Sequence, residues 1–153
     1  NQTRRTRDDI AQPFGGWGLL FHRDDIARLG QWLVPGGGTI GGQRVLDAGL
    51  LAAALQQDGS GLPAGPAGLS YRGGFWSLDA APYIGCDHEL RVPFMAGFGG
   101  IVVALFPNGV TYYHFADGGS ERWAQAIRGA DRLRPLCRAG NAGTARRSKQ
   151  PED

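Results

Sequence analysis

The sequence predicts an α+β fold, in which an antiparallel sheet carries a C-terminal helix packed on it. Three observations support this prediction. Two helical patterns come first, β-prone segments rich in aromatic and β-branched residues follow, and a further helical pattern comes last. Consecutive strands joined by short connections pair antiparallel, and a final helix can then pack back on the sheet.

The first two helices are predicted from apolar spacing and start signals. Asp24-Asp25 opens the first, because acidic side chains suit a helix N-terminus. Small or apolar residues at i, i+3, i+4 and i+7 form its buried face: Ile26, Leu29, Gly30 and Leu33. Pro35 and the glycines after it end this helix. Asp47 is the predicted N-cap of the second helix, whose buried stripe has four members: Leu50, Leu51, Ala54 and Leu55.

The sheet is predicted from residue 69 onward, after a Gly/Pro-rich loop over 58–68. Its first β-prone stretch contains Tyr71, Phe75 and Trp76 and is interrupted by Gly73-Gly74, and residues 79–91 are irregular. Two further strands are predicted over Phe94–Gly97 and Ile101–Phe106. The second of these does not alternate in polarity, so we expect cover on both of its faces.

A hairpin and a helix complete the predicted domain. Pro107-Asn108-Gly109 connects to a last strand, Val110–Phe115, in which alternate residues share a face. Ser120 is the predicted cap of the last helix, which Pro135 ends. Its apolar side is formed by Trp123, Ile127, Ala130 and Leu133. We assign 1–13 to a polar lead-in, 14–136 to one folded domain, and 137–153 to a disordered basic tail.

Composition excludes several classes of protein. The net charge is only +2, and the basic residues gather at the two ends, which is typical of solvated tails rather than a nucleic-acid surface. No apolar run approaches the roughly 20 residues that span a bilayer. The chain begins with Asn1 and has no signal-peptide pattern, so we interpret it as a segment of a longer polypeptide. Any export signal would lie upstream of it, so the sequence does not predict a localisation.

Three further features carry hypotheses of their own. Cys86 and Cys137 either form a disulfide, as an oxidising compartment would allow, or stay unpaired. The run 86–89 offers four metal-ligand types, but adjacent residues rarely converge on one ion, so a polar surface loop is the default and we expect no metal or other cofactor. Ser77, His114 and Asp117 could form a triad, although nothing in the sequence fixes their geometry.

Four segments together resemble the serine β-lactamase-related hydrolases, a family that includes penicillin-binding proteins, class C-like β-lactamases and esterases. In chain order they are Gly15-Gly16-Trp17-Gly18-Leu19-Leu20 with the helix from Asp25, Gly42-Gln43-Arg44-Val45-Leu46, Tyr71-Arg72-Gly73-Gly74-Phe75-Trp76, and Met95-Ala96-Gly97-Phe98-Gly99-Gly100. The resemblance implies that 14–136 is the C-terminal part of a β-lactamase/transpeptidase-like fold. It also implies hydrolysis of a small ester or amide through an acyl-enzyme.

The family chemistry needs a Ser-x-x-Lys nucleophile and a Tyr-x-Asn element, and this sequence has neither. Its one lysine is Lys149, and the residue three positions earlier is Arg146. Because the lysine must lie one helical turn from the serine to accept its proton, the nucleophile is expected in an N-terminal part of the same polypeptide that this sequence lacks. We therefore expect the segment alone to be inactive. Family members are often exported or periplasmic.

The resemblance assigns the strand side of the site to Met95, Ala96 and Gly97, followed by Phe98 and Gly99. The backbone N–H of Phe98 would be one oxyanion donor, and such a donor contributes about 3–4 kcal/mol to transition-state stabilisation. Met95 stands where the family has lysine or histidine, which favours a neutral ester or amide substrate. The simpler alternative is that glycines 97, 99 and 100 only allow close strand packing.

Aromatic residues carry the remaining hypotheses. Trp76 is a candidate to border the substrate cleft, and the alternative is that it is a buried core residue. The second candidate function belongs to another class: the chain would be a non-catalytic binding or structural module that uses an aromatic sheet face. That face would comprise Tyr71, Phe75, Trp76, Tyr112 and Tyr113.

Overall fold

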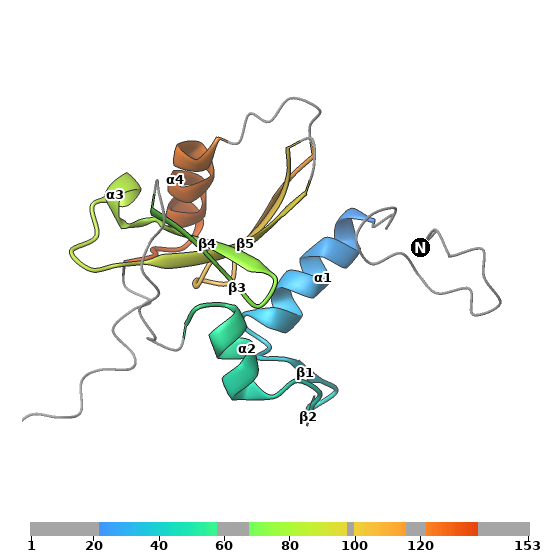
Figure 1. The fold of residues 1–153 in the computed structure, drawn as a ribbon. Helices are drawn as coiled ribbons and strands as arrows, with labels where there is room; N and C mark the ends of the chain where they lie inside the picture. The colour runs from blue at the N-terminus through green and yellow to red at the C-terminus, as the bar shows by residue number, and fades with distance from the viewer. Residues whose placement is uncertain (1–21, 58–67, 98–99, 116–121, 138–153) are drawn as a thin grey trace, which may run out of the picture.

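A computed structural model of the chain describes residues 22–57, 68–97, 100–115 and 122–137. These ranges form a five-stranded antiparallel sheet, a two-stranded sheet and four helices (Figure 1). The α+β class and the antiparallel sheet are therefore confirmed. The predicted lead-in, the segment around Trp17, most of the Gly/Pro-rich loop and the tail beyond Cys137 lie outside the described residues.

The main sheet has the strand order β3-β4-β5-β6-β7, so every strand pairs with its neighbours in sequence. Its strands are β3 (Leu69–Arg72), β4 (Phe75–Asp79), β5 (Arg91–Gly97), β6 (Ile101–Leu105) and β7 (Thr111–His114). The small sheet pairs β1 (Thr39–Ile40) with β2 (Gln43–Arg44). The helices are α1 (Arg23–Leu33), α2 (Ala48–Ala54), α3 (Ala81–Ile84) and α4 (Trp123–Leu133).

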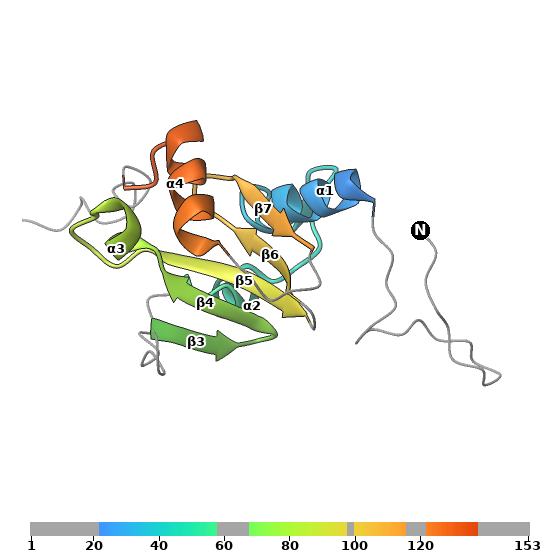
Figure 2. The same cartoon turned by 90° about the horizontal axis from the view of Figure 1, so that it is seen from above.

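Helices cover both faces of the main sheet (Figures 1 and 2). On the face that we call the α4 face, sheet residues such as Phe94, Val102 and Ala104 pack with Ile127 and Ala130 of α4. Complete burial of an isoleucine such as Ile127 contributes about 1.5–3 kcal/mol to stability. The C-terminal helix is thus packed on the sheet as predicted.

The opposite face, the α1 face, packs against α1 and α2. Leu105 of β6 is buried there with Leu33 of α1 and Leu55 after α2. Gly30 brings α1 very close to β7, because a Cβ placed on it would lie 1.9 Å from Thr111 Oγ1. The absence of a side chain at position 30 therefore sets the distance between this helix and the sheet.

Most of the predicted local signals are confirmed. The Asp47 carboxylate accepts a hydrogen bond from Leu50 N at 2.8 Å, as an N-cap should. Gly109 has a φ of +83° in the β6–β7 connection, where its N–H donates to Phe106 O at 2.9 Å. The register of β7 on β6 also places alternate residues of β7 on opposite faces.

Several predictions about single residues and short segments were wrong. Leu50 and Leu133, both predicted to be buried, are 74% and 77% exposed, because their helices meet the sheet only with the neighbouring stripe. Helix α4 has Arg122 as its N-cap rather than Ser120, which lies outside the described residues. The segment predicted to be irregular over 79–91 contains α3, and the connection before Asp47 contains the β1–β2 hairpin.

The cysteines form a disulfide, which settles the two alternatives left open by the sequence. Cys86 follows α3 and Cys137 follows α4, and their Cα atoms are 5.6 Å apart. Cys137, assigned to the tail on sequence grounds, is thereby joined to the folded part. Within the described ranges, no helix is long and apolar enough to cross a membrane.

Candidate functional site

The C-terminal half of β5 is paired on one side only among the described residues. Strand β4 pairs with β5 from Arg91 to Phe94, whereas β6 pairs with it from Phe94 to Gly97. From Met95 to Gly97, β5 therefore has no paired residue on the side that faces away from β6 within the described ranges, and the register places Phe75, the first residue of β4, opposite Met95. We call this the open edge of β5. Figure 2 shows β5 running past the β3–β4 turn.

The short β3–β4 hairpin creates the open edge. Its turn is formed by Gly73 and Gly74, with φ values of +57° and +89° that glycine adopts readily. A Cβ on Gly73 would lie 2.9 Å from Ala54 Cβ, so the turn rests directly on α2. Because the chain reverses here, β4 begins at Phe75 and its pairing with β5 extends only to Phe94, so Met95–Gly97 have no pair on this side within the described ranges.

Met95 and Ala96 lie on opposite faces of the sheet beside this edge. Met95 pairs with Val103, which packs with α1 and α2, and its side chain is half-buried. Ala96 pairs with Val102 on the α4 face and is exposed, as is Gly97. A ligand along the open edge would thus meet the Met95 side chain on one face and the Ala96 methyl group on the other.

Strand alternation determines what the backbone of the open edge can do. In an antiparallel strand, every second residue directs its N–H and C=O to the same side. Some of the polar groups of Met95–Gly97 therefore point away from β6. Because they belong to an ordered strand, such N–H groups are already oriented before any ligand arrives.

The loop that follows β5 is described only in part. Phe98 and Gly99, the predicted oxyanion donor and its neighbour, lie outside the described residues. Gly100 has a φ of +87°, a conformation that side chains disfavour. A Cβ on Gly97 would lie 3.3 Å from Ile101 Cβ, so close packing accounts for part of the need for glycine at position 97.

Trp76 lies next to the start of the open edge, on the α4 face. It pairs with Phe94, the last residue of β5 that β4 covers, and it is 38% exposed. The rings of Tyr71, Trp76, Phe94 and Trp123 form a row, with successive centroids 4.9, 6.5 and 4.8 Å apart. Trp76 thus borders the edge on the face opposite to Met95.

The five aromatic residues proposed for a binding module do not share one sheet face. Tyr71, Trp76 and Tyr112 lie in one row across the α4 face, where Tyr112 packs against the core. Phe75 packs with α2 on the α1 face, which Tyr113 also shares by its register with Val103. Of these five residues, only Tyr71 and Trp76 are therefore exposed on the α4 face.

The structure does not bring the alternative catalytic groups together. Ser77 is completely buried on the α1 face of β4, whereas His114 lies on the α4 face of β7, with β5 and β6 between them. Asp117 lies outside the described residues. The strand alternation that separates Ser77 from His114 rules out the triad.

The run from Cys86 to Glu89 also forms no ligand cluster. Cys86 is in the disulfide, Asp87 hydrogen-bonds to His88 Nδ1 at 2.7 Å, and Glu89 forms an ion pair with Arg91. No group of three or more histidine, cysteine or acidic side chains suited to a metal occurs in the part of the chain that is described. The hydrogen bond from His88, followed by smaller backbone and charge effects, lowers the pKa of Asp87.

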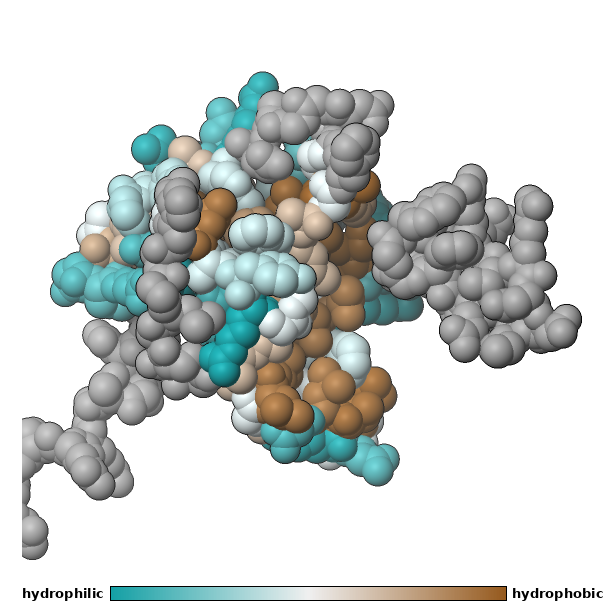
Figure 3. All heavy atoms as spheres, viewed as in Figure 1, coloured by the Kyte–Doolittle hydropathy of each residue, from teal (hydrophilic) through white to brown (hydrophobic). Residues whose placement is uncertain are grey.

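Two exposed apolar areas were not anticipated from the sequence. One lies on the α1 face near the open edge, where Ile101, Tyr113 and Phe115 are 43%, 36% and 51% exposed. The other lies around α2 and the β1–β2 hairpin (Figure 3), with Ile40 and Val45 more than half exposed. Alternation placed Tyr113 and Phe115 on one face, but only the position of α1 shows that this end of the face is uncovered.

A scan against protein-family models found no match, and searches of curated proteins and of solved structures likewise found none.

Proposed function

We propose that this chain is the C-terminal part of a serine hydrolase related to the β-lactamases, with β5 as the strand side of its active site. The full polypeptide would cleave a small ester or amide through an acyl-enzyme. The observation that carries the proposal is the open edge of β5. It lies at Met95–Gly97, the residues whose sequence resembles the family's strand motif.

An open strand edge suits acyl transfer for a physical reason. The reaction develops negative charge on the carbonyl oxygen of the substrate, and oriented backbone N–H groups stabilise that charge. A substrate that contains an amide can also hydrogen-bond along a strand edge as an added strand does. Both uses need a strand edge with unpaired N–H groups, and among the described residues the β4–β5 pairing ends at Phe94, before Met95–Gly97.

The architecture around the edge is consistent with the proposed partial fold. A five-stranded antiparallel sheet carries the C-terminal helix α4 on one face and α1 and α2 on the other. The end of the α1 face beside the open edge is apolar and exposed at Ile101. We propose that the nucleophile-bearing part of the polypeptide packs beside this end.

The nucleophile must come from residues that this sequence does not include. No Ser-x-x-Lys occurs in the 153 residues. The two serines of the main sheet, Ser70 and Ser77, are both buried and have no lysine near them in sequence. Without a base to accept its proton, a serine hydroxyl is a poor nucleophile. The chain alone is therefore expected to be inactive.

The substrate proposed for the site is uncharged near the strand. Met95 occupies the position from which a lysine or histidine would attract a substrate carboxylate. The residues paired with the end of β5 are Ile101, Val102 and Val103, which carry no charge. A neutral ester or amide fits this surface better than a β-lactam or a peptidoglycan peptide.

Two experiments test the proposal. First, the coding sequence upstream of Asn1 is read for a Ser-x-x-Lys. Second, the full polypeptide and the 153-residue chain are incubated with a chromogenic ester, and intact mass is measured for an acyl adduct. We expect an adduct on the upstream serine in the full polypeptide and none on this chain. A stable adduct on a serine of this chain, or an upstream sequence without the motif, would refute the proposal.

A second candidate function is a non-catalytic binding module, and one observation favours it. Tyr71 and Trp76 form an exposed aromatic pair at the β3 side of the sheet, with Tyr71 59% exposed. Such a pair can bind an apolar or planar ligand by its ring faces. Absence of the upstream motif, together with ligand-induced quenching of tryptophan fluorescence that Tyr71→Ala removes, would favour the module over the enzyme.

A further inference from the structure

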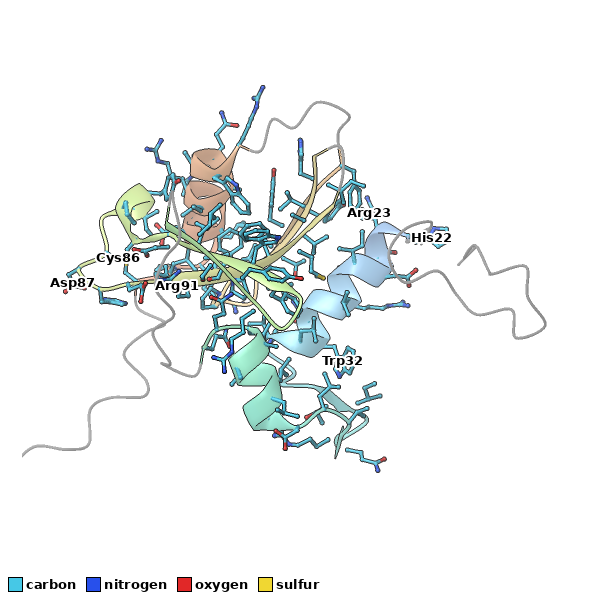
Figure 4. All side chains as sticks on the ribbon, viewed as in Figure 1. His22, Arg23, Trp32, Cys86, Asp87 and Arg91 are labelled. Atoms are coloured by element: carbon cyan, nitrogen blue, oxygen red, sulfur yellow. A yellow bond between two sulfur atoms is a disulfide. The ribbon has the colours of Figure 1, made fainter. Side chains whose placement is uncertain are left out.

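The disulfide joins two segments that lie at one end of the α4 face. Cys86 and Cys137, the only cysteines of the sequence, are separated by 51 positions in the chain. Cys86 follows α3, in the long connection between β4 and β5, and Cys137 follows α4. Figure 4 shows Cys86 and Asp87 in this connection, at the side of the molecule away from α1. The bond therefore fastens the connection to the end of the C-terminal helix.

The base of the β4–β5 connection is held without the disulfide. Asp79 Oδ1 accepts hydrogen bonds from the backbone N–H groups of Ala81 and Leu90, both at 3.0 Å. Ala80 N also donates to Leu90 O at 2.8 Å. These bonds hold the two ends of the connection together where it leaves β4 and enters β5. The part of the connection farthest from the sheet, which we call its tip, must therefore be held by other contacts.

The tip of the connection has weaker non-covalent attachments. Arg128 of α4 donates a solvent-exposed hydrogen bond of 3.4 Å to Tyr83 O. Ile84 and Cys86, both half-buried, pack against the core beneath α4. A four-residue helix such as α3 is not stable by its own backbone hydrogen bonds. The covalent bond to Cys137 is therefore the strongest attachment of this tip.

The segment after α4 is held by non-covalent contacts up to the residue before the disulfide, at Arg134, which hydrogen-bonds with Asn108, and at Leu136. Leu136 N donates to Asp131 Oδ1 at 2.8 Å, and the Leu136 side chain is completely buried. Cys137 is the next residue, and the disulfide connects this buried point to the tip of the β4–β5 connection. The disulfide thus adds a covalent link to the non-covalent contacts between the two segments.

We infer that the Cys86–Cys137 disulfide is a structural staple for α3 and the end of α4, and that the protein works in an oxidising compartment. Structural disulfides persist in such compartments and are rare where thiol reductants act. With a dithiol reductant, the S–S bond breaks and two S–H bonds form, while the reductant gives up two electrons and two protons and becomes a disulfide. The inference does not depend on the proposed hydrolase activity.

The test compares the full polypeptide exported to an oxidising compartment before and after treatment with a dithiol. We expect no reactive thiol in the denatured, untreated protein at these two positions. Peptide masses should give a cross-linked Cys86–Cys137 pair, and reduction should lower Tm by about 10 °C. The double variant Cys86→Ser/Cys137→Ser is the matched control, since the dithiol should not change its Tm. Failure of this variant to fold would itself support the staple.

Hydrogen exchange provides a local readout that does not need the variant. On reduction, the amides of Gly85, Cys86 and Leu136 should exchange at least tenfold faster, whereas the Leu90 amide, held by Asp79, should change little. The inference is overturned if the exported protein has two reactive thiols at these positions. An unchanged Tm together with unchanged exchange after reduction would overturn it as well.

Discussion

Asn108 and Arg134 hydrogen-bond to each other in both directions. Asn108 Nδ2 donates to Arg134 O at 2.6 Å, and Arg134 Nη1 donates to Asn108 O at 2.7 Å. Asn108 Nδ2 also donates to Ala130 O at 3.0 Å, and its Oδ1 accepts from Val110 N at 3.1 Å. The last carbonyls of a helix lack partners within the helix. The β6–β7 turn therefore supplies the C-terminal cap of α4 and fixes this helix on the sheet.

Replacing Asn108 by alanine should lower the free energy of unfolding by about 2–3 kcal/mol. The side chain is only 5% exposed, so its truncation removes the partner of Val110 N and the donor to Arg134 O at a buried place, while Ala130 O keeps only its bond from Arg134 N. Urea unfolding measures the effect. The control is Gln125→Ala on the exposed side of α4, which should change stability by less than about 0.5 kcal/mol. Equal stability of both variants would show that the turn does not cap α4.

Gly30→Ala should destabilise the chain by about 1–3 kcal/mol, although alanine favours helix formation. The new Cβ would lie 1.9 Å from Thr111 Oγ1 and 2.9 Å from Thr111 Cβ, so α1 must move away from β7. The matched control is Gly129→Ala in α4, where nothing lies within 4 Å of the new Cβ. This control should stabilise by about 0.5–1 kcal/mol. We expect thermal unfolding to show a lower Tm for Gly30→Ala and a higher Tm for Gly129→Ala. A raised Tm for Gly30→Ala would contradict the close contact.

The parts of the fold that local chemistry determines could be predicted from the sequence. Asp47 is followed by an apolar helical stripe, and it caps α2 as expected. Proline, asparagine and glycine in succession predicted the β6–β7 hairpin, and alternation in β7 predicted which of its residues share a face. Each of these signals depends on neighbours within a few positions, which a single sequence contains.

The parts that depend on distant segments could not be predicted. Leu50 has the spacing of a buried residue, but the position of α2 on the sheet leaves it exposed. The pairing of Cys86 with Cys137 depends on the contact between α3 and α4, and α3 itself lacks a helical pattern in the sequence. The sequence of Met95–Gly97 suggested a strand-side site by resemblance alone, but its open edge arises because one hairpin ends before its neighbour does.

Asp87 should titrate below the ordinary pKa of an aspartate, and His88→Ala should raise its pKa again. The hydrogen bond from His88 is the main cause of the lowered pKa, so its loss removes most of the shift. A lowered pKa in the folded state stabilises the fold above the ordinary pKa, and this contribution disappears as the pH falls through the lowered pKa. NMR titration of the carboxyl carbon measures the shift. His22→Ala, at a distant surface histidine, is the control and should leave Asp87 unchanged; an equal effect of both variants would contradict the assignment.

Met95→Lys should change the substrate preference of the full polypeptide if β5 lines the active site. A lysine at this position would place an ammonium group on the α1 face beside the open edge, where it can bind a substrate carboxylate. A charge-assisted hydrogen bond of this kind should raise kcat/KM for a carboxylate-bearing ester about tenfold relative to its neutral analogue. The measurement is the ratio of the two kcat/KM values in the variant and the parent protein.

Ala96→Lys is the matched control for Met95→Lys, because it adds the same charge one residue further along the strand. Its side chain lies on the α4 face, so its ammonium group points away from the side where Met95 lies. We expect the ratio to rise in Met95→Lys and to stay within about twofold of the parent in Ala96→Lys, since a solvated charge on the opposite face interacts weakly with the substrate. Equal ratios in the two variants would mean that the charge acts through the general field of the protein. In that case Met95 does not face the substrate, and the site must be placed elsewhere on the sheet.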